Sequence, residues 1–184
     1  MPFSATDSGT SSTLPTPRPR RRPNDQFAIG DTLCVGPNVE FERIPSFPPE
    51  RFALLRNPNP SKYKQFQKGI EQLMQEGAIQ IMYFSDSPAR YPILAAVGSL
   101  QFEVVQYRML AEYSVETAVE PLPEYTHARW LSAPTEKLEK MQWIVNARKA
   151  EDAYGRPVAL VKGEWALNYL IEQNPDITFH DIPG

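Results

Sequence analysis

The spacing of apolar residues changes from strand-like to helical near the middle of the chain. Residues 93–97 form an uninterrupted apolar run, rich in small and β-branched side chains, that is too short for a stable helix. This run predicts a strand buried on both faces, at the centre of a sheet. After Gly98 the period is about 3.6, and the apolar side chains fall mostly on one helical face: Leu100, Val104, Val105, Met109 and Ala111. The pattern predicts a turn at Gly98 and then a helix whose N-cap is Ser99.

The region around this strand continues the alternation of strand and helix. Strand-like alternation occurs in three further segments, over residues 39–47, 78–84 and 115–120. After an Asn-Pro-Asn-Pro breaker, Ser61 is expected to cap a helix that ends at Gly77, with a buried stripe of Phe66, Ile70, Leu73 and Met74. Residues 39–123 therefore predict an α+β fold, the ferredoxin-like split β-α-β-β-α-β unit, with two helices on one face of four strands.

The remainder of the chain, residues 124–184, has the same alternation in shorter segments. Three strands are predicted, over residues 126–131, 157–161 and 176–179. A helix is predicted over residues 164–174, and another from Thr135 with an inward face of Leu138, Met141, Ile144 and Val145. The three tryptophans are expected to anchor this smaller α/β part: Trp130, Trp143 and Trp165.

The first 38 residues differ from the rest in composition. Residues 1–24 contain eight serines or threonines and five prolines with almost nothing to bury, so they are predicted to be disordered. Their arginines permit three interpretations: a solvated tail, a nucleic-acid contact or an organelle transit signal. Residues 25–38 predict two short β segments hinged at Gly30, which either pack on the following domain or form the edge of something larger.

Composition and charge restrict the classes of function. With 184 residues and 41% hydrophobic content, the chain can bury a real core in one domain or two small ones. Residues 1–24 carry four arginines and one aspartate, so the other residues have a net charge of about −6, against −3 overall. The folded part is therefore not expected to bind polyanions in general. Since no apolar run has the length of a membrane span or a secretory signal, we expect a cytoplasmic protein, or an organellar one if the tail is a transit segment.

Few residues offer catalytic chemistry. No Gly-x-x-x-x-Gly-Lys-Ser/Thr run is present, and Gly98 is followed by no second glycine or lysine, which favours a turn over a phosphate loop. Cys34 alternates with apolar neighbours and is interpreted as a packed thiol rather than a nucleophile. The histidines lack the spacing of a metal site. Nothing favours an enzyme, and one with catalytic groups scattered along the sequence is the third and weakest alternative.

Two groups of polar residues are candidate contacts for a partner. Lys62, Lys64 and Lys68 lie on the polar side of the first predicted helix. They either touch RNA phosphates or form an ordinary solvated surface. His127 and Arg129 are interpreted as surface or interface residues of the smaller part.

Several blocks of sequence occur in a familiar order and spacing: residues 44–50, 67–70, 75–80, 96–105, 112–113, 128–130 and 175–179. Together these blocks resemble the C-terminal domain of bacterial peptide chain release factor 3, a translational GTPase. The resemblance covers roughly residues 25–181, and residues 27–33 resemble the closing strands of that family's β-barrel domain. Elongation factor G also carries ferredoxin-like domains, but the Leu-Gln-Phe-Glu-Val-Val block fits release factor 3 better.

The resemblance implies a role in translation termination. In the family, the whole protein binds the ribosome in its GTP form and promotes departure of the codon-reading release factors after peptide release. Those release factors and the ribosome, with its RNA and proteins, are the implied partners. No catalytic, cofactor or metal residue is implied here, because the GTP-binding domain would precede Gln26. The alternative is a free-standing ribosome-binding or protein-binding domain, or a truncated gene product, without GTPase linkage.

Overall fold

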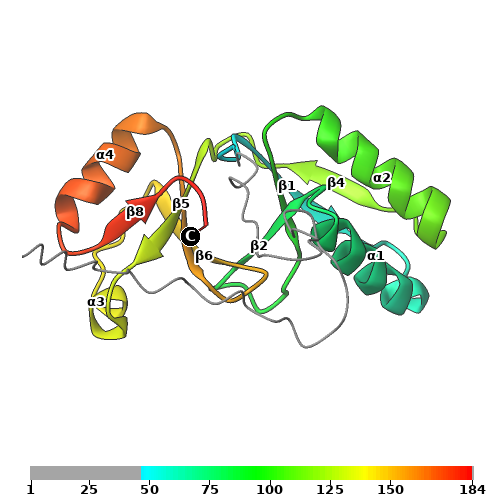
Figure 1. Cartoon of the computed structure of the whole chain (residues 1–184), viewed down its shortest axis with the longest axis horizontal. Helices are drawn as coiled ribbons and strands as arrows, with labels where there is room; N and C mark the ends of the chain where they lie inside the picture. The colour runs from blue at the N-terminus through cyan, green and yellow to red at the C-terminus, as the bar shows by residue number, and fades with distance from the viewer. Residues whose placement is uncertain (1–46, 184) are drawn as a thin grey trace, which may run out of the picture.

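The computed structural model describes residues 47–183 (Figure 1). The predictions for the tail, the hairpin over residues 25–38, Cys34 and the strand that begins at Val39 lie outside the described residues. The strands are β1 (Arg51–Arg56), β2 (Gln80–Phe84), β3 (Ile93–Ala96), β4 (Ala118–Pro121), β5 (His127–Ser132), β6 (Ala147–Asp152), β7 (Pro157–Val161) and β8 (Thr178–His180). The helices are α1 (Tyr63–Gln75), α2 (Leu100–Tyr113), α3 (Thr135–Glu139) and α4 (Glu164–Gln173), with a 3-10 turn, η1, at Pro60–Lys62.

The eight strands within residues 47–183 belong to one antiparallel sheet, in the order β4-β1-β3-β2-β6-β7-β5-β8. The predicted α+β class is confirmed, and so is the internal position of β3, whose four residues are all buried. Over residues 51–121 the elements follow the predicted order β-α-β-β-α-β. The smaller part continues the same sheet, because β6 pairs with β2.

Helices α1 and α2 cover one face of the first four strands. Their core includes Phe66, Ile70 and Leu73 of α1, as predicted, and the left-handed Gly77 (φ 67°) follows the helix. The two helices approach closely at Gly69, where an added Cβ would lie 2.6 Å from the Sδ of Met109. A glycine in mid-helix is normally unfavourable, so its value here is the close contact that it permits.

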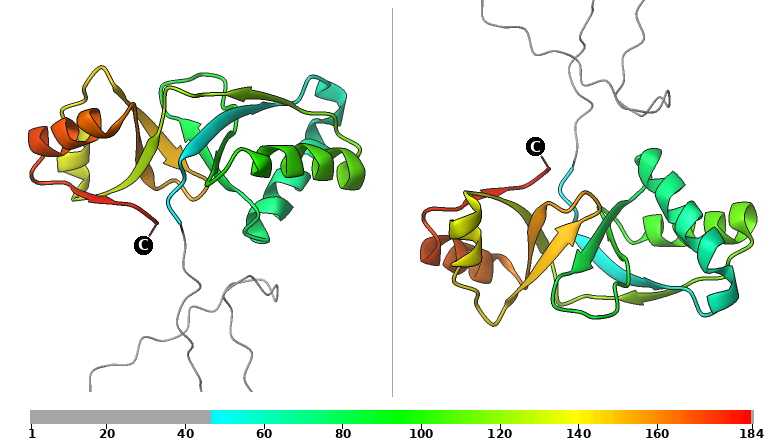
Figure 2. Two further views of the ribbon diagram at one scale, coloured as in Figure 1. Left: turned by 90° about the horizontal axis from the view of Figure 1, so that it is seen from above. Right: turned by 90° about the horizontal axis from the view of Figure 1, so that it is seen from below.

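The opposite face of these strands packs against the second half of the molecule. Phe52, Met82 and Ile93 meet Trp130 and Leu160 in a second core between the two halves of the sheet. A third core, under α3 and α4, includes Leu131, Val161, Leu167 and Leu170. The two helix pairs therefore lie at opposite ends of the molecule with the strands between them (Figure 2).

Two strands of the described residues were not predicted. One is β1 (Arg51–Arg56); the strand predicted over residues 39–47 lies, except for Phe47, outside the described residues. The helix predicted from Thr135 ends at Glu139, and β6 follows it. Val145, expected inward, is 98% exposed.

Three predicted packing or capping roles were also wrong. Trp165 is 72% exposed, whereas Trp130 is buried. Ser99 makes no side-chain capping bond; the Oε1 of Gln101 instead accepts from the backbone N–H groups of Val97 and Gly98. Ser61 caps no helix either, since the Asn59 side chain accepts its N–H at the start of η1.

The inner face of α2 differs from the predicted one. Phe102, Val105 and Met109 are buried, whereas Leu100 and Val104 are exposed. The sequence pattern merged two apolar faces of one helix into a single stripe. The turn at Gly98 has no positive φ, and an added Cβ there would meet no atom within 4 Å, so it does not require glycine.

Candidate functional site

The three candidate lysines have different environments. The ammonium of Lys62 donates a hydrogen bond to the carbonyl of Ser114, the left-handed residue that ends α2. This contact satisfies a carbonyl at a helix C-terminus, where a cation is favoured. Lys64 and Lys68 are one turn apart on the exposed side of α1, and neither forms an ion pair with another residue in the described part of the chain. They are the pair available to a partner.

His127 and Arg129 lie on β5, in the other half of the molecule (Figure 1). The Nε of Arg129 is 2.9 Å from Asp181, and its Nη1 donates to the carbonyl of Ala128. His127 Nδ1 is 2.8 Å from the hydroxyl of Thr126. Both side chains are half-buried and engaged within the fold. The structure does not bring them together with the lysines of α1.

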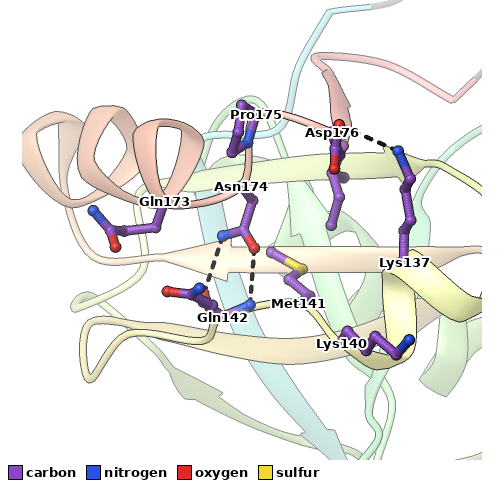
Figure 3. Close-up of a pocket in the computed structure, with 9 residues that line it drawn as sticks. Lys137, Lys140, Met141, Gln142, Gln173, Asn174, Pro175 and Asp176 are labelled. Atoms are coloured by element: carbon purple, nitrogen blue, oxygen red, sulfur yellow. Dashed lines mark hydrogen bonds and ion pairs between the residues drawn. The ribbon is translucent and has the colours of Figure 1, made fainter.

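A small pocket of about 290 Å³ lies between α3 and the end of α4 (Figure 3). Its wall is organised by buried Asn174, which accepts from the N–H of Gln142 and donates to the carbonyls of Gln142 and Leu170. At the rim, Lys137 pairs with Asp176 at 3.2 Å. Every polar group of Asn174 is used to hold the chain, so the pocket presents no free group of this residue to a ligand.

A second polar centre holds the β6–β7 hairpin. Asp152 is 6% exposed and accepts from the Trp130 indole N–H (3.1 Å), the Arg156 guanidinium (2.6 Å) and the N–H groups of Tyr154 and Arg156. Asp152 and Asn174 were not among the predicted site residues. The available signal was turn chemistry, since Asp152 lies three residues before Gly155 and Asn174 directly precedes Pro175.

Arginines stacked on aromatic rings occupy one end of the first four strands. The guanidinium of Arg148 lies 3.7 Å from the centroid of Phe84, and Arg56 lies 4.4 Å from that of Tyr91. Arg148 also donates three hydrogen bonds of 2.8 to 3.1 Å to Asp86, which lower the pKa of the Asp86 carboxyl. Arg56 pairs with Glu120 at 2.8 Å, so both arginines are already neutralised by carboxylates.

Arg108 joins the ends of the two long helices. Its guanidinium binds Glu76 at 2.6 Å and Glu112 at 2.6 Å. The hydrogen bonds to both carboxylates raise the pKa of Arg108, and the bond from Arg108 lowers the pKa of Glu112. Tyr113 adds a hydrogen bond of 2.8 Å to Gln72 across the same helix pair. This group stabilises the α1–α2 contact.

Residues 47–183 contain no cluster of three or more histidine, cysteine or acidic side chains that could hold a metal ion. None of the helices described in that range has the length and apolar character of a membrane span.

Comparison with known proteins identifies the family. A family model described as "Class II release factor RF3, C-terminal domain" matches residues 41–171. The chain is 54% identical over 157 residues to peptide chain release factor 3 of Gloeobacter violaceus, covering 85% of this chain and 29% of that protein. It is 58% identical over 151 residues to peptide chain release factor 3 of Rippkaea orientalis, covering 82% of this chain and 28% of that protein. The chain thus spans less than a third of the length of these relatives. It belongs to the class II release factor RF3 family, through that family's C-terminal domain.

Proposed function

We propose that this chain acts in translation termination as the ribosome-docking C-terminal module of a release factor 3-like protein. The observation that carries the proposal is the family match over residues 41–171, together with 54–58% identity to proteins named peptide chain release factor 3. The partners are the ribosome and the codon-reading release factors whose recycling it promotes. This role places the chain with ribosomes in the cytoplasm, or in an organelle if residues 1–24 are a transit segment.

The mechanism we propose is positional rather than catalytic. One sheet runs through both halves of the described chain, and three cores brace it on its two faces. A closely packed body of this kind moves as a unit, so it can convert a nucleotide-dependent change elsewhere into a change of orientation on the ribosome. GTP would belong to a separate domain, and this chain itself needs no cofactor.

Lys64 and Lys68 are the ribosome contacts that this proposal favours. Both are exposed, both lie on one side of α1, and the described residues around them supply no ion pair. Lys62 is less suitable because its ammonium binds the Ser114 carbonyl. The chain is acidic overall, so attraction to RNA phosphates must come from such local groups.

Co-sedimentation with purified ribosomes tests the proposal. We expect the full chain to pellet with ribosomes at low salt, and the Lys64→Gln/Lys68→Gln variant to pellet less. The matched control is Lys137→Gln/Lys140→Gln, which removes the same charge from α3 and its C-cap in the other half. Absence of the wild-type chain from the pellet at every salt concentration would contradict ribosome docking. Equal loss in both variants would mean that charge alone, and not the α1 surface, is responsible.

A titration with a fluorescent GTP analogue tests the non-catalytic part of the proposal. We expect no saturable binding, since the sequence has no phosphate-binding loop of the P-loop type. Saturable micromolar binding would contradict it. Pelleting that is indifferent to added codon-reading release factors would favour the alternative of a free-standing ribosome-binding domain.

A further inference from the structure

Several arginines of this protein are held by the same two kinds of group. Among residues 47–183, four arginines lie over an aromatic ring, 3.7 to 5.3 Å from its centroid, and all four also pair with a carboxylate. The planar guanidinium can stack on a ring and bind a carboxylate with its edge at the same time. The four sets are Arg56 with Tyr91 and Glu120, Arg90 with Tyr83 and Glu151, Arg148 with Phe84 and Asp86, and Arg156 with Tyr154 and Asp152.

Helix α4 presents the same two kinds of group on its exposed side. The rings of Trp165 and Tyr169 are stacked, with centroids 5.5 Å apart and planes inclined by 9°. Trp165 is 72% exposed and Tyr169 is 40% exposed, so the pair belongs to none of the three cores. Glu172 is exposed and follows Tyr169 by three residues, which places it on the same side of the helix. We call Trp165, Tyr169 and Glu172 the aromatic-acidic face.

The described part of the chain supplies no cation to the aromatic-acidic face. No lysine or arginine of residues 47–183 lies over the ring of Trp165 or Tyr169, and Glu172 forms no ion pair within that range. The ammonium of Lys162, just before the helix, lies 5.3 Å from the centroid of the Tyr125 ring instead. Glu164, the first residue of α4, is a further exposed carboxylate. The face therefore combines exposed rings with uncompensated negative charge.

Charge complementarity favours a guanidinium as the occupant of this face. Two stacked rings leave their outer faces open, and the face of an aromatic ring attracts cations. A single-stranded RNA could also stack a base on Trp165, but its phosphates would then approach Glu164 and Glu172. A purely apolar partner would bury these carboxylates without compensating their charge. An arginine satisfies both the rings and the carboxylate, and its guanidinium is less strongly hydrated than the ammonium of lysine.

We propose that the aromatic-acidic face of α4 binds an arginine side chain of a partner protein. The guanidinium stacks on the exposed rings and pairs with the carboxylate of Glu172, as four arginines already do with other rings and carboxylates of this protein. Helix α4 lies at the opposite end of the molecule from α1, so this contact leaves Lys64 and Lys68 free (Figure 1). The surface is separate from the one proposed to dock on the ribosome, and the inference does not rest on that function.

An NMR titration of the isotope-labelled full chain with a blocked peptide, acetyl-Gly-Arg-Gly-Arg-Gly-amide, tests the proposal. We expect saturable shifts of the α4 backbone amide signals and of the Trp165 indole N–H signal. The corresponding lysine peptide should bind several-fold more weakly, because its ammonium does not stack. The citrulline peptide keeps the shape of arginine without its charge, and it should cause no saturable shift. Equal binding of the arginine and citrulline peptides, or no shift on α4 with the arginine peptide, would overturn the proposal.

Two pairs of variants separate this site from general effects of charge and apolar surface. Glu172→Gln should weaken binding of the arginine peptide several-fold, whereas Glu139→Gln, which removes the same charge from an exposed position on α3, should not. Trp165→Leu keeps an apolar side chain but removes the ring, and it should also weaken binding several-fold. Its control is Tyr107→Leu, at an exposed aromatic position on α2. Equal weakening by a variant and its control would overturn the proposal, since net charge or apolar surface alone would then explain the binding.

Two further measurements test other occupants of the same face. Shifts of the α4 signals with oligoadenylate, and not with the arginine peptide, would overturn the proposal in favour of RNA. Changes of these signals on dilution of the chain without any peptide would overturn it in favour of a second copy; we expect neither. None of these experiments uses ribosomes, so failure of this proposal and failure of the proposed function are distinguishable.

Discussion

The two ends of the molecule are stabilised by different means. In the first half, two helices of 13 and 14 residues pack closely through Gly69 and Met109, and apolar contacts predominate. In the second half, the helices have 5 and 10 residues, and two buried polar side chains hold the loops between the elements. Long helices can rely on side-chain packing, whereas short elements need hydrogen bonds from side chain to backbone to define their ends.

The largest effect is expected at Asp152, because it satisfies several donors at once. Asp152→Ala leaves the Trp130 indole, the Arg156 guanidinium and two backbone N–H groups without their acceptor. We expect a loss of about 3 kcal/mol in the free energy of unfolding, measured by urea denaturation. Asp152→Asn keeps one carbonyl oxygen and should lose clearly less. Equal losses for the two variants would contradict this, because they would mean that the oxygen kept by asparagine contributes nothing and that the charge or the second oxygen of the carboxylate is what matters.

A somewhat smaller loss of stability is expected at Gly69, in the first half of the molecule, where apolar packing predominates. Gly69→Val places methyl groups where even a Cβ would lie 2.6 Å from the buried Met109 Sδ, so it should cost about 2 kcal/mol. The measurement is a thermal melt of Gly69→Val, of Met109→Ala and of Gly69→Val/Met109→Ala. We expect the double variant to lose less than the sum of the two single variants, because the shorter side chain makes room. Simple additivity would mean that the two residues do not share this contact.

Asn174 tests whether a buried polar side chain also stabilises the segment around Gln142 in the second half. Asn174→Ala removes three hydrogen bonds to the backbone of Gln142 and Leu170, and we expect a loss of about 1 to 2 kcal/mol. Asn168→Ala is the control, since that asparagine is exposed on α4. Hydrogen exchange should report faster opening of the segment around Gln142 in Asn174→Ala alone. An unchanged exchange rate around Gln142 in Asn174→Ala would contradict the role of Asn174 in holding this loop.

The same difference explains which features the sequence predicted. Periodicity predicted the buried stripe of α1 and the buried strand β3, because packing on one or both faces leaves a regular pattern. It failed over residues 135–145, where Asn174, about thirty residues further along, fixes the backbone of Gln142 and no helix continues. Periodicity predicted helix α2 itself but not its buried face. Apolar residues lie on two sides of this helix, so the pattern did not show which side packs on the sheet.

The candidate residues show a related limit. Sequence spacing placed the three lysines near one another on a polar surface, but it could not show that Lys62 reaches the end of a helix more than fifty residues away. Nor could it show that Arg129 pairs with Asp181. Tertiary contacts decide which charged side chains are free, and these contacts are not local in sequence.

A small, pH-dependent effect is expected at the surface pair of Asp86 and Arg148. Arg148 lowers the pKa of Asp86 in the folded state. The pair therefore stabilises the fold fully at pH values above the unfolded-state pKa of aspartate. This stabilisation is lost as the pH falls through the lower, folded-state pKa of Asp86. Because the Asp86 side chain is 57% exposed, Asp86→Asn should cost less than about 0.5 kcal/mol at pH 7. Thermal melts of both proteins should converge in acid. A difference that persists unchanged at low pH would contradict an electrostatic origin.

The salt dependence of ribosome binding tests the central claim, docking through α1, most directly. Affinity is measured for the wild-type chain and for Lys64→Gln/Lys68→Gln over a range of salt concentrations, with melts to show that both are folded. Surface substitutions of this kind should change stability by less than about 0.5 kcal/mol. If the two lysines contact RNA phosphates, the slope of log affinity against log salt should become shallower by roughly 1 to 2 in the variant. An unchanged slope and affinity in a folded variant would contradict docking through α1, and would direct attention to the surface around His127 and Arg129.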